Sequence, residues 1–419
     1  MCKSKKMNRK NFEIMAPVGS YESLTAAIKN GADAVYFGIG NLNMRSRSSA
    51  NFNLQDLVQI ASICRENEVN SYLTVNTVIY DDDIEEMHKT VEAAMQADIS
   101  AIIASDMAVI LYCRQIGMPV HISTQVNVSN IEAVRFYSQF SDVMVLAREL
   151  SLSKVKEISR QINEENICGP SGAPVRLEMF CHGALCMAVS GKCYLSLHQL
   201  NSSANRGACN QICRRSYIVT DRETGQELEV DNKYIMSPKD LKTIHFLNKL
   251  IDAGVSVFKI EGRARGPEYV AETVACYSEA IEAICNGAFT DDKIEAWDER
   301  LRRVFNRGFW DGYYLGQQLG EWTKNYGSSA SHVKIYSSRS VRYFPKIGVG
   351  EFVCESESLR VGDEVLLTGP TTGAEFFRIE ELRVDLQPVE EVKKGDRFSL
   401  PVPCKNRPAD RLYLWKPTR

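Results

Sequence analysis

The sequence contains no apolar run that approaches the roughly 18 residues of a membrane-spanning helix. Its N-terminus, MCKSKKMNRKNFEIM, also has no apolar stretch of signal-peptide length, which argues against secretion. The net charge is only -3 at pH 7, so no overall charge draws the chain towards nucleic acid. Any RNA binding would therefore depend on local groups of basic residues.

Several catalytic signatures are missing as well. No G-x-G-x-x-G follows the first predicted strand, and no H-E-x-x-H occurs, so the sequence has neither a dinucleotide-binding fingerprint nor a zincin signature. A Ser-His-Asp triad is recognised by geometry and not by order, so none can be read here. The sequence therefore contains no catalytic motif that would support a peptidase function.

Cysteine, in contrast, is abundant, with 13 residues, which we expect to be reduced in a cytoplasmic protein. Four of them follow the spacing C-x6-C-x15-C-x3-C, and soft thiolates so close together indicate an iron-sulfur cluster or a zinc site. Zinc prefers ligands paired two to four residues apart. Only the last two cysteines are that close, so a cluster is the first hypothesis and zinc the second. The predicted metal ligands are Cys186, Cys193, Cys209 and Cys213.

The surroundings of these cysteines also indicate a specialised site. Three glycines interrupt regular structure there, at Gly183, Gly191 and Gly207. Three arginines add positive charge, which lowers the pKa of nearby thiols: Arg206, Arg214 and Arg215. Two further cysteines, Cys181 and Cys276, are alternative ligands that could replace one of the four.

Short β-rich runs alternate with helical patterns in the first two thirds of the chain, as in repeated βα units around a parallel sheet. Eight such runs predict a TIM-like barrel, and an open doubly wound sheet is the alternative. The predicted strands cover residues 12–15, 34–38, 71–75, 101–104, 120–123, 143–146, 176–180 and 257–261. Helix candidates with apolar residues three and four apart lie between them, such as ESLTAAIKN and DLVQIASICREN.

The chain divides into three predicted parts. Residues 1–11 form a flexible basic N-terminus with Lys3, Lys5, Lys6, Arg9 and Lys10, and residues 12–330 form the barrel domain. A cysteine-rich segment, residues 181–215, follows the seventh strand and is longer than an ordinary loop, which favours a functional role. Residues 217–235 predict a hairpin that turns at Thr224 and Gly225. Residues 331–419 contain only short alternating strands and predict a small all-β barrel.

Polar residues follow the predicted strands, and in a TIM barrel the loops at these strand ends build the active site. Arginine there matches the oxygens of a carboxylate or phosphate in two parallel hydrogen bonds, so a dicarboxylate or nucleotide is the expected ligand. The candidate catalytic residues are His182, Lys259, Glu261 and Arg263. The candidate cofactor-binding residues are Arg45, Arg47, Asn76, His121 and Gln125.

Two of these assignments have a structural alternative. Lys259 and Glu261 are two residues apart on one strand, so both can face the barrel interior and form a structural ion pair. His121 could equally be a core histidine whose hydrogen bonds are satisfied. His182 is better placed for a role in the site, because it lies between Cys181 and Cys186.

Five stretches together carry a family resemblance: MAPVGSYESLTAAIKNGADAVYFG, EMFCHGALCMAVSGKCYLS, NRGACNQICRR, SPKDL and FKIEGRAR. Over residues 12–330 the chain resembles the collagenase-like peptidase family, number 32 of the class of unknown mechanism. Within it, the chain is similar to the branch that hydroxylates RNA pyrimidines in tRNA or rRNA.

The resemblance implies oxygen-independent formation of a 5-hydroxypyrimidine, with a [4Fe-4S] cluster on the four cysteines and prephenate as the source of the hydroxyl group. It also implies tRNA or rRNA as the partner, without deciding between them. No membrane is expected as a partner, because the sequence has no long apolar run. A peptidase, as the family name asserts, and a non-catalytic scaffold of a hydroxylase assembly are the alternatives. The oligomeric state and the need for a hydroxylase partner stay open.

Overall fold

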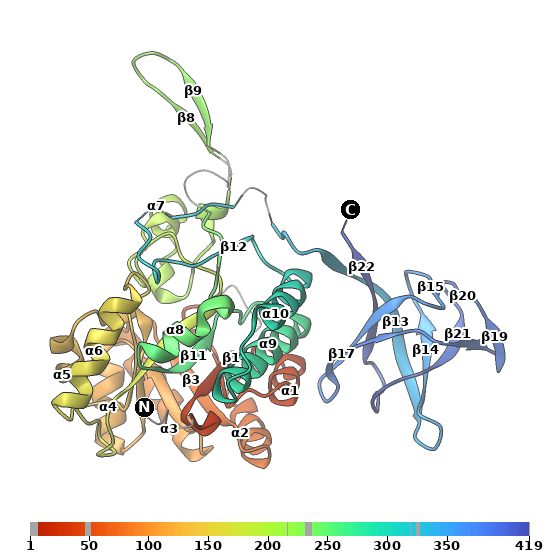
Figure 1. The fold of residues 1–419 in the computed structure, drawn as a ribbon, viewed down its shortest axis with the longest axis horizontal. Helices are drawn as coiled ribbons and strands as arrows, with labels where there is room; N and C mark the ends of the chain where they lie inside the picture. Colours follow the sequence, from red (N-terminus) through yellow and green to blue (C-terminus); the bar gives the residue numbers. More distant parts are fainter. Residues whose placement is uncertain are drawn as a thin grey trace.

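The computed structural model describes residues 7–46, 52–215, 217–230, 237–318, 320–323 and 327–418. A closed parallel barrel lies beside an antiparallel sheet domain (Figure 1). The barrel closes because its last strand pairs with both the first and the seventh. Its strands are β1 (Glu13–Pro17), β2 (Ala34–Phe37), β3 (Asn70–Val75), β4 (Ala101–Ala104), β5 (Val120–Ile122), β6 (Val143–Val145), β7 (Arg176–Gly183) and β11 (Val255–Ile260).

Each predicted strand overlaps one of these eight, so the predicted TIM-like barrel is confirmed. The doubly wound alternative is wrong, because a doubly wound sheet is open at both edges. Here β11 pairs with both β1 and β7, so the sheet is closed. Helices cover the outside of the barrel, and in the described residues none is long and apolar enough to cross a membrane. They are α1 (Tyr21–Lys29), α2 (Asp56–Glu66), α3 (Ile84–Gln96), α4 (Met107–Ile116), α5 (Ile131–Tyr137), α6 (Leu152–Glu164), α8 (Leu247–Asp252), α9 (Pro267–Cys285) and α10 (Asp291–Arg303).

The helices form where an apolar face meets the barrel. In α1, the Ser20 hydroxyl accepts a hydrogen bond from the Ser23 amide and caps the N-terminus, while Leu24 and Ala27 are fully buried. The inside of the barrel has its own packed cluster, which includes Tyr36 and Tyr72. The barrel is therefore a filled core, and a site can form only at its ends.

The cysteine-rich segment leaves the barrel at Gly183, the last residue of β7. Gly183 has a φ of +105°, and a Cβ there would lie 2.2 Å from the Glu261 carbonyl oxygen, so only glycine fits. The segment carries the short helix α7 (Leu195–Leu200). The chain later returns to the barrel through β10 (Asp240–Lys242), which pairs with β7 and with β12 (Phe309–Trp310).

A hairpin of β8 (Tyr217–Thr220) and β9 (Glu227–Val230) projects from the cysteine-rich segment (Figure 1). Gly225 turns it with a φ of +68°. The predicted hairpin is therefore confirmed over residues 217–230, while residues 231–235 lie outside the described residues.

The C-terminal domain is all-β, as predicted. Its main sheet has eight antiparallel strands in the order β17-β16-β22-β13-β14-β21-β18-β19, and no pairing in the described residues joins β17 to β19. The strands are β13 (His332–Phe344), β14 (Val349–Cys354), β16 (Glu364–Gly369), β17 (Gly373–Arg378), β18 (Leu382–Val384), β19 (Gln387–Val389), β21 (Arg397–Pro401) and β22 (Arg411–Pro417), with β15 (Leu359–Arg360) and β20 (Glu391–Val392) as a separate pair.

This sheet packs directly on the barrel helices. Leu366 and Trp415 belong to the same buried apolar cluster as the barrel core. Beside them the Thr25 hydroxyl donates to the Pro370 carbonyl at 2.6 Å, and Lys29 pairs with Glu375 at 2.7 Å. The two domains therefore share a core, and the C-terminal sheet is not a tethered appendage.

Part of the predicted flexible N-terminus is held against the barrel. Arg9 lies in the short 3-10 helix η1 (Arg9–Asn11), pairs with Asp33 at 2.8 Å and donates to the Phe12 carbonyl at 2.8 Å. Lys3, Lys5 and Lys6 lie outside the described residues. Arg9 thus finds a carboxylate on the barrel, and the flexibility of residues 1–11 stays a prediction.

Candidate functional site

The carboxyl ends of the barrel strands and the cysteine-rich segment enclose a cavity of about 390 Å³. Tyr36, Thr74 and Lys259 contribute to its barrel side, and Met187 and Leu195 to the side formed by the cysteine-rich segment. The long segment after β7 thus reaches the mouth of the barrel, where TIM-barrel sites form.

Cys186, Cys193, Cys209 and Cys213 all line this cavity, and all are free thiols. Burial raises the pKa of the Cys213 thiol to about 11; Arg214 opposes the shift, and the other three cysteines add to it. The Cys213 thiol therefore lies close enough to the other three to respond to their charge. The sequence spacing correctly placed four thiols around one space.

The donor chemistry of the cavity fits a cluster. In the described residues no three His, Cys, Asp or Glu side chains are grouped so that they could hold a metal ion. Four cysteine thiols line the one cavity, and an iron-sulfur cluster takes one thiolate at each iron. Neither alternative cysteine lines the cavity, because Cys181 and Cys276 are both buried in the barrel core.

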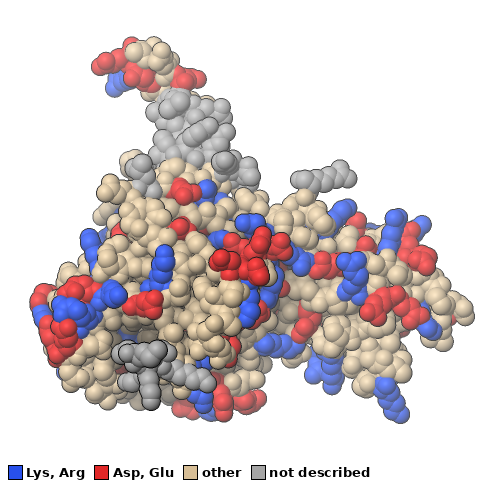
Figure 2. All heavy atoms as spheres, in the orientation of Figure 1, with Lys and Arg blue, Asp and Glu red and all other residues tan. Residues whose placement is uncertain are grey.

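The cavity is strongly cationic. Glu261 is the one carboxylate among the described residues that line it. Its basic side chains are Arg45, Arg148, Arg214, Arg263, Arg265, Arg307 and Lys259. On the outer face shown in Figure 2, basic and acidic side chains are mixed, in keeping with the net charge of -3. Positive charge is thus concentrated where the thiols are.

The sequence predicted part of this cationic group. Arg45 and Arg263 line the cavity as expected, whereas Arg47 lies outside the described residues. Sequence reasoning missed Arg265 and Arg307. Arg265 could have been found, because it follows Arg263 in the same GRAR stretch. Arg307 lies after α10, and no sequence pattern connects it with the barrel mouth.

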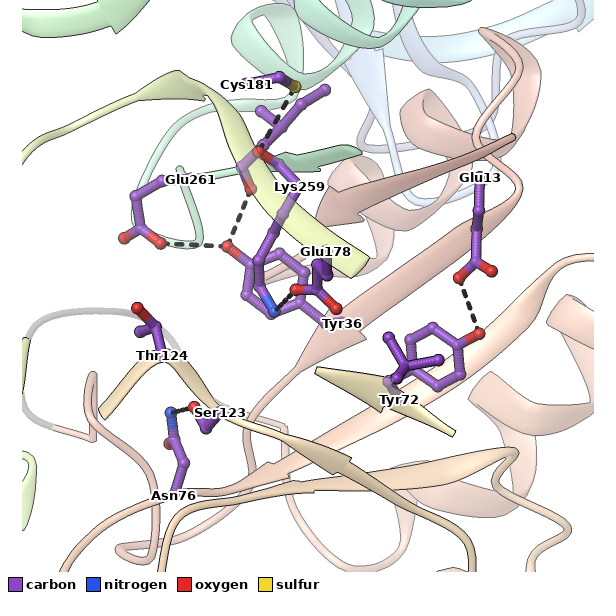
Figure 3. Close-up of polar contacts among 12 residues, drawn as sticks. Glu13, Tyr36, Tyr72, Asn76, Ser123, Thr124, Glu178, Cys181, Lys259 and Glu261 are labelled. Atoms are coloured by element: carbon purple, nitrogen blue, oxygen red, sulfur yellow. Dashed lines mark hydrogen bonds and ion pairs between the residues drawn. The ribbon is translucent and has the colours of Figure 1, made fainter. Parts of the chain in front are cut away.

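Glu261 is the centre of an ion network at the cavity wall, and Figure 3 shows its contact with Tyr36. Its Oε1 accepts from Arg45 Nη2 at 2.9 Å, and the Tyr36 hydroxyl lies 3.1 Å from its Oε2. Burial raises the pKa of Glu261, but Arg45, Arg148 and Arg263 outweigh burial and hold the pKa at about 2. Glu261 is therefore ionised and keeps the arginines in place.

We expect Glu261 to make the free energy of unfolding depend on pH in the acidic range. Its folded pKa of about 2 lies below its ordinary value of 4.5, so its contribution is present above pH 4.5 and is lost as pH falls towards 2. That contribution is about 3 kcal/mol. Urea unfolding of Glu261→Gln should show a deficit of this size at pH 6 that shrinks at pH 3. The exposed Glu299→Gln is the control, and a deficit independent of pH would contradict the assignment.

Lys259 pairs with Glu178 and not with Glu261, which corrects the ion pair considered from the sequence. Lys259 Nζ donates to Glu178 Oε1 at 2.7 Å, and both side chains are buried (Figure 3). Glu178 Oε2 has no hydrogen-bond partner in the described residues. Burial raises the pKa of Glu178, and Lys259 opposes that shift. Glu261 has its own partner in Arg45.

Asn76 and Gln125 lie side by side in the cavity wall. Asn76 Nδ2 is 3.4 Å from both Ser123 Oγ and Gln125 Oε1, and Ser123 donates to Gln125. The Met44 amide donates to Asn76 Oδ1 at 3.2 Å, which ties the loop after β2 to the end of β3. The structure thus brings together two predicted binding residues as a polar patch.

Neither candidate histidine lines the cavity. His182 is 1% exposed and lies among the rings of Tyr269, Tyr277 and Phe309, and His121 is 8% exposed and packs on Tyr72. Burial lowers the pKa of both to about 3, so both imidazoles are neutral. This corrects the expected position of His182, which the strand carries into the core. No histidine in the described residues lines the cavity.

The fold and site define a class: a TIM-like barrel whose mouth is lined by four thiols and a group of arginines. The sequence profile described as peptidase family U32 matches residues 19–324, so the chain belongs to peptidase family U32. The resemblance seen in the sequence is thereby confirmed.

Three relatives show how far the likeness extends. The chain is 64% identical to a protein named collagenase from Porphyromonas gingivalis, over 97% of this chain and 98% of the relative. It is 33% identical to tRNA hydroxylation protein P1 of Bacillus subtilis, over 76% of each. It is 34% identical to the 23S rRNA 5-hydroxycytidine C2501 synthase of Escherichia coli, over 65% of this chain and 40% of the relative.

Proposed function

We propose that this protein is an oxygen-independent RNA hydroxylase that forms a 5-hydroxypyrimidine in tRNA or rRNA. It uses a [4Fe-4S] cluster on Cys186, Cys193, Cys209 and Cys213, with prephenate as the source of the hydroxyl group. The observation that carries the proposal is the single cavity in which these four thiols face a cationic wall. Thiols hold iron, and arginines bind the carboxylates of a small acid.

The residues of this chain then have distinct tasks. When bound, the cluster supplies a metal centre that can polarise or reduce a ligand. Arg45 and Arg263, held by Glu261 and Thr74, present positive charge to a dicarboxylate. Asn76 and Gln125 offer amide groups suited to the edge of a pyrimidine.

Lys259 lines the barrel side of the cavity, where its ion pair with Glu178 holds the ammonium group in place. The thiols must stay reduced to bind iron, which agrees with a cytoplasmic setting. The relatives named for tRNA and rRNA hydroxylation support RNA as the partner, and their similar identities, 33% and 34%, favour neither RNA over the other.

The first test is the iron and acid-labile sulfide content of protein purified without oxygen. About four irons per chain are expected. Nucleosides from a deletion strain should then lack 5-hydroxyuridine in tRNA or 5-hydroxycytidine in rRNA, and wild-type protein should restore the missing nucleoside. Absence of iron after anaerobic reconstitution, or a tetrahedral zinc site, would contradict the proposal.

Peptidase activity is the second candidate, because the relative at 64% identity is named collagenase. Histidine is the usual base for a cysteine or serine nucleophile, and no histidine in the described residues lines the cavity. Cleavage of a collagen peptide by cluster-free protein would favour the peptidase. Binding of RNA and prephenate without turnover would instead favour a scaffold role.

A further inference from the structure

The arginines of the cavity fall into two groups. Arg45 and Arg263 belong to the first, around Glu261. Arg265 and Arg307 belong to the second group. Arg265 lies shortly after the end of β11, and Arg307 lies shortly before the start of β12. Both of their guanidinium groups lie over the ring of Phe305, at 3.5 Å for Arg265 and 5.2 Å for Arg307. One aromatic ring therefore supports two cations at the cavity wall.

The Arg265 guanidinium has no hydrogen bond or ion pair in the part of the chain that the structure describes. The side chain is half-buried and lines the cavity. Burial, together with Arg307, lowers the pKa of Arg265 to about 10. A guanidinium has five donors in a planar fork, and leaving them unused in a partly buried place is costly. A ligand oxyanion would satisfy them.

The neighbouring charges do not neutralise this group. Arg307 Nη1 is 3.4 Å from Asp240 Oδ1, a long contact, and Asp240 is 2% exposed and does not line the cavity. Arg214 adds a third cation, but its donors are already used by Ser237, Pro238 and Leu185. Three arginines thus share one carboxylate, and Arg265 is the one whose donors are available.

We propose that Arg265 and Arg307, stacked on Phe305, form an oxyanion subsite that binds a carboxylate or a phosphate, separate from the Arg45 and Glu261 group. The subsite itself follows from the arrangement of these side chains. Only the identity of its ligand rests on the proposed function, which supplies two sources: a carboxylate of the hydroxyl donor, or a phosphate of the RNA.

Binding measurements can separate the two sources. Full-length protein purified without oxygen is titrated by calorimetry with malonate, a dicarboxylate, and with uridine 5′-monophosphate. In Arg265→Gln we expect one of the two affinities to fall about tenfold, or about 1.4 kcal/mol. A loss for malonate assigns the subsite to the co-substrate, and a loss for the nucleotide assigns it to an RNA phosphate.

Three further variants keep the test decisive. Arg265→Lys keeps the charge but loses the fork, so its affinity should be intermediate. Phe305→Leu removes the stacking surface and should weaken the same ligand. The exposed Arg222→Gln on the hairpin is the control and should bind as wild type does.

Unchanged affinity for both ligands in folded Arg265→Gln and Arg265→Lys would overturn the subsite. Binding is measured without turnover, so failure of the proposed hydroxylation would be seen separately, in the iron and nucleoside analyses.

Discussion

Replacement of Cys209 by serine is expected to abolish the proposed RNA hydroxylation. Serine matches cysteine in shape but binds iron poorly, so the site would lose one of four soft ligands. We expect the hydroxylated nucleoside to fall by at least about 100-fold, or about 2.7 kcal/mol. A deletion strain carrying the variant gives the nucleoside level by mass spectrometry, and anaerobically purified variant gives the iron content.

Cys168→Ser is the matched control. Cys168 is also a free, partly exposed thiol, but it lies in the turn before β7, away from the cavity. Its serine variant should keep full iron and full hydroxylation. If Cys209→Ser kept both as well, the thiols of the cavity would have no role in the reaction, and the peptidase and scaffold alternatives would come first.

Replacement of Lys259 by methionine is expected to give the largest loss of stability. Glu178 is fully buried and pairs with Lys259, so the variant leaves a buried carboxylate without its counter-charge. Breaking such a pair on one side costs about 3–5 kcal/mol. The free energy of unfolding in urea at pH 8 measures this loss. The double variant Lys259→Met/Glu178→Leu should recover most of it.

The loss should also depend on pH. Without Lys259, burial and the charge of Glu13 raise the folded pKa of Glu178 above the unfolded value, against a smaller opposing effect of Arg176. An acid whose folded pKa is raised takes up a proton more readily when folded, so the variant should be less impaired at pH 5.5 than at pH 8. Lys89→Met breaks the exposed pair with Glu85 and is the control, expected to match wild type. Equal effects of Lys259→Met and Lys89→Met would contradict the buried pair.

The positions of the eight strands could be predicted because strand formation leaves a local signal. Runs such as AVYF and AIIA are apolar on both faces, which parallel strands inside a barrel require. Barrel closure followed from the number of βα units. The four cysteines were equally visible, since 28 residues can bring them to one cavity with no contribution from distant parts of the chain.

The partners of charged residues could not be predicted in the same way. Lys259 and Glu261 are close in sequence, yet Lys259 finds Glu178, which is 81 residues away, because β7 and β11 are neighbours in the closed barrel. His182 is next to Cys181 and close to Cys186, yet its position at the end of strand β7 directs its ring into the core. Sequence proximity was misleading in both cases.

The sequence by itself determined the barrel, the thiol segment and the family. The tertiary structure alone decided that Arg265 and Arg307 share the ring of Phe305, and that no histidine among the described residues reaches the cavity. The physical reason is the range of the interactions. Strand patterns and cysteine spacing act over a few residues, whereas Coulomb and stacking contacts join side chains that only the closed fold brings within a few ångströms.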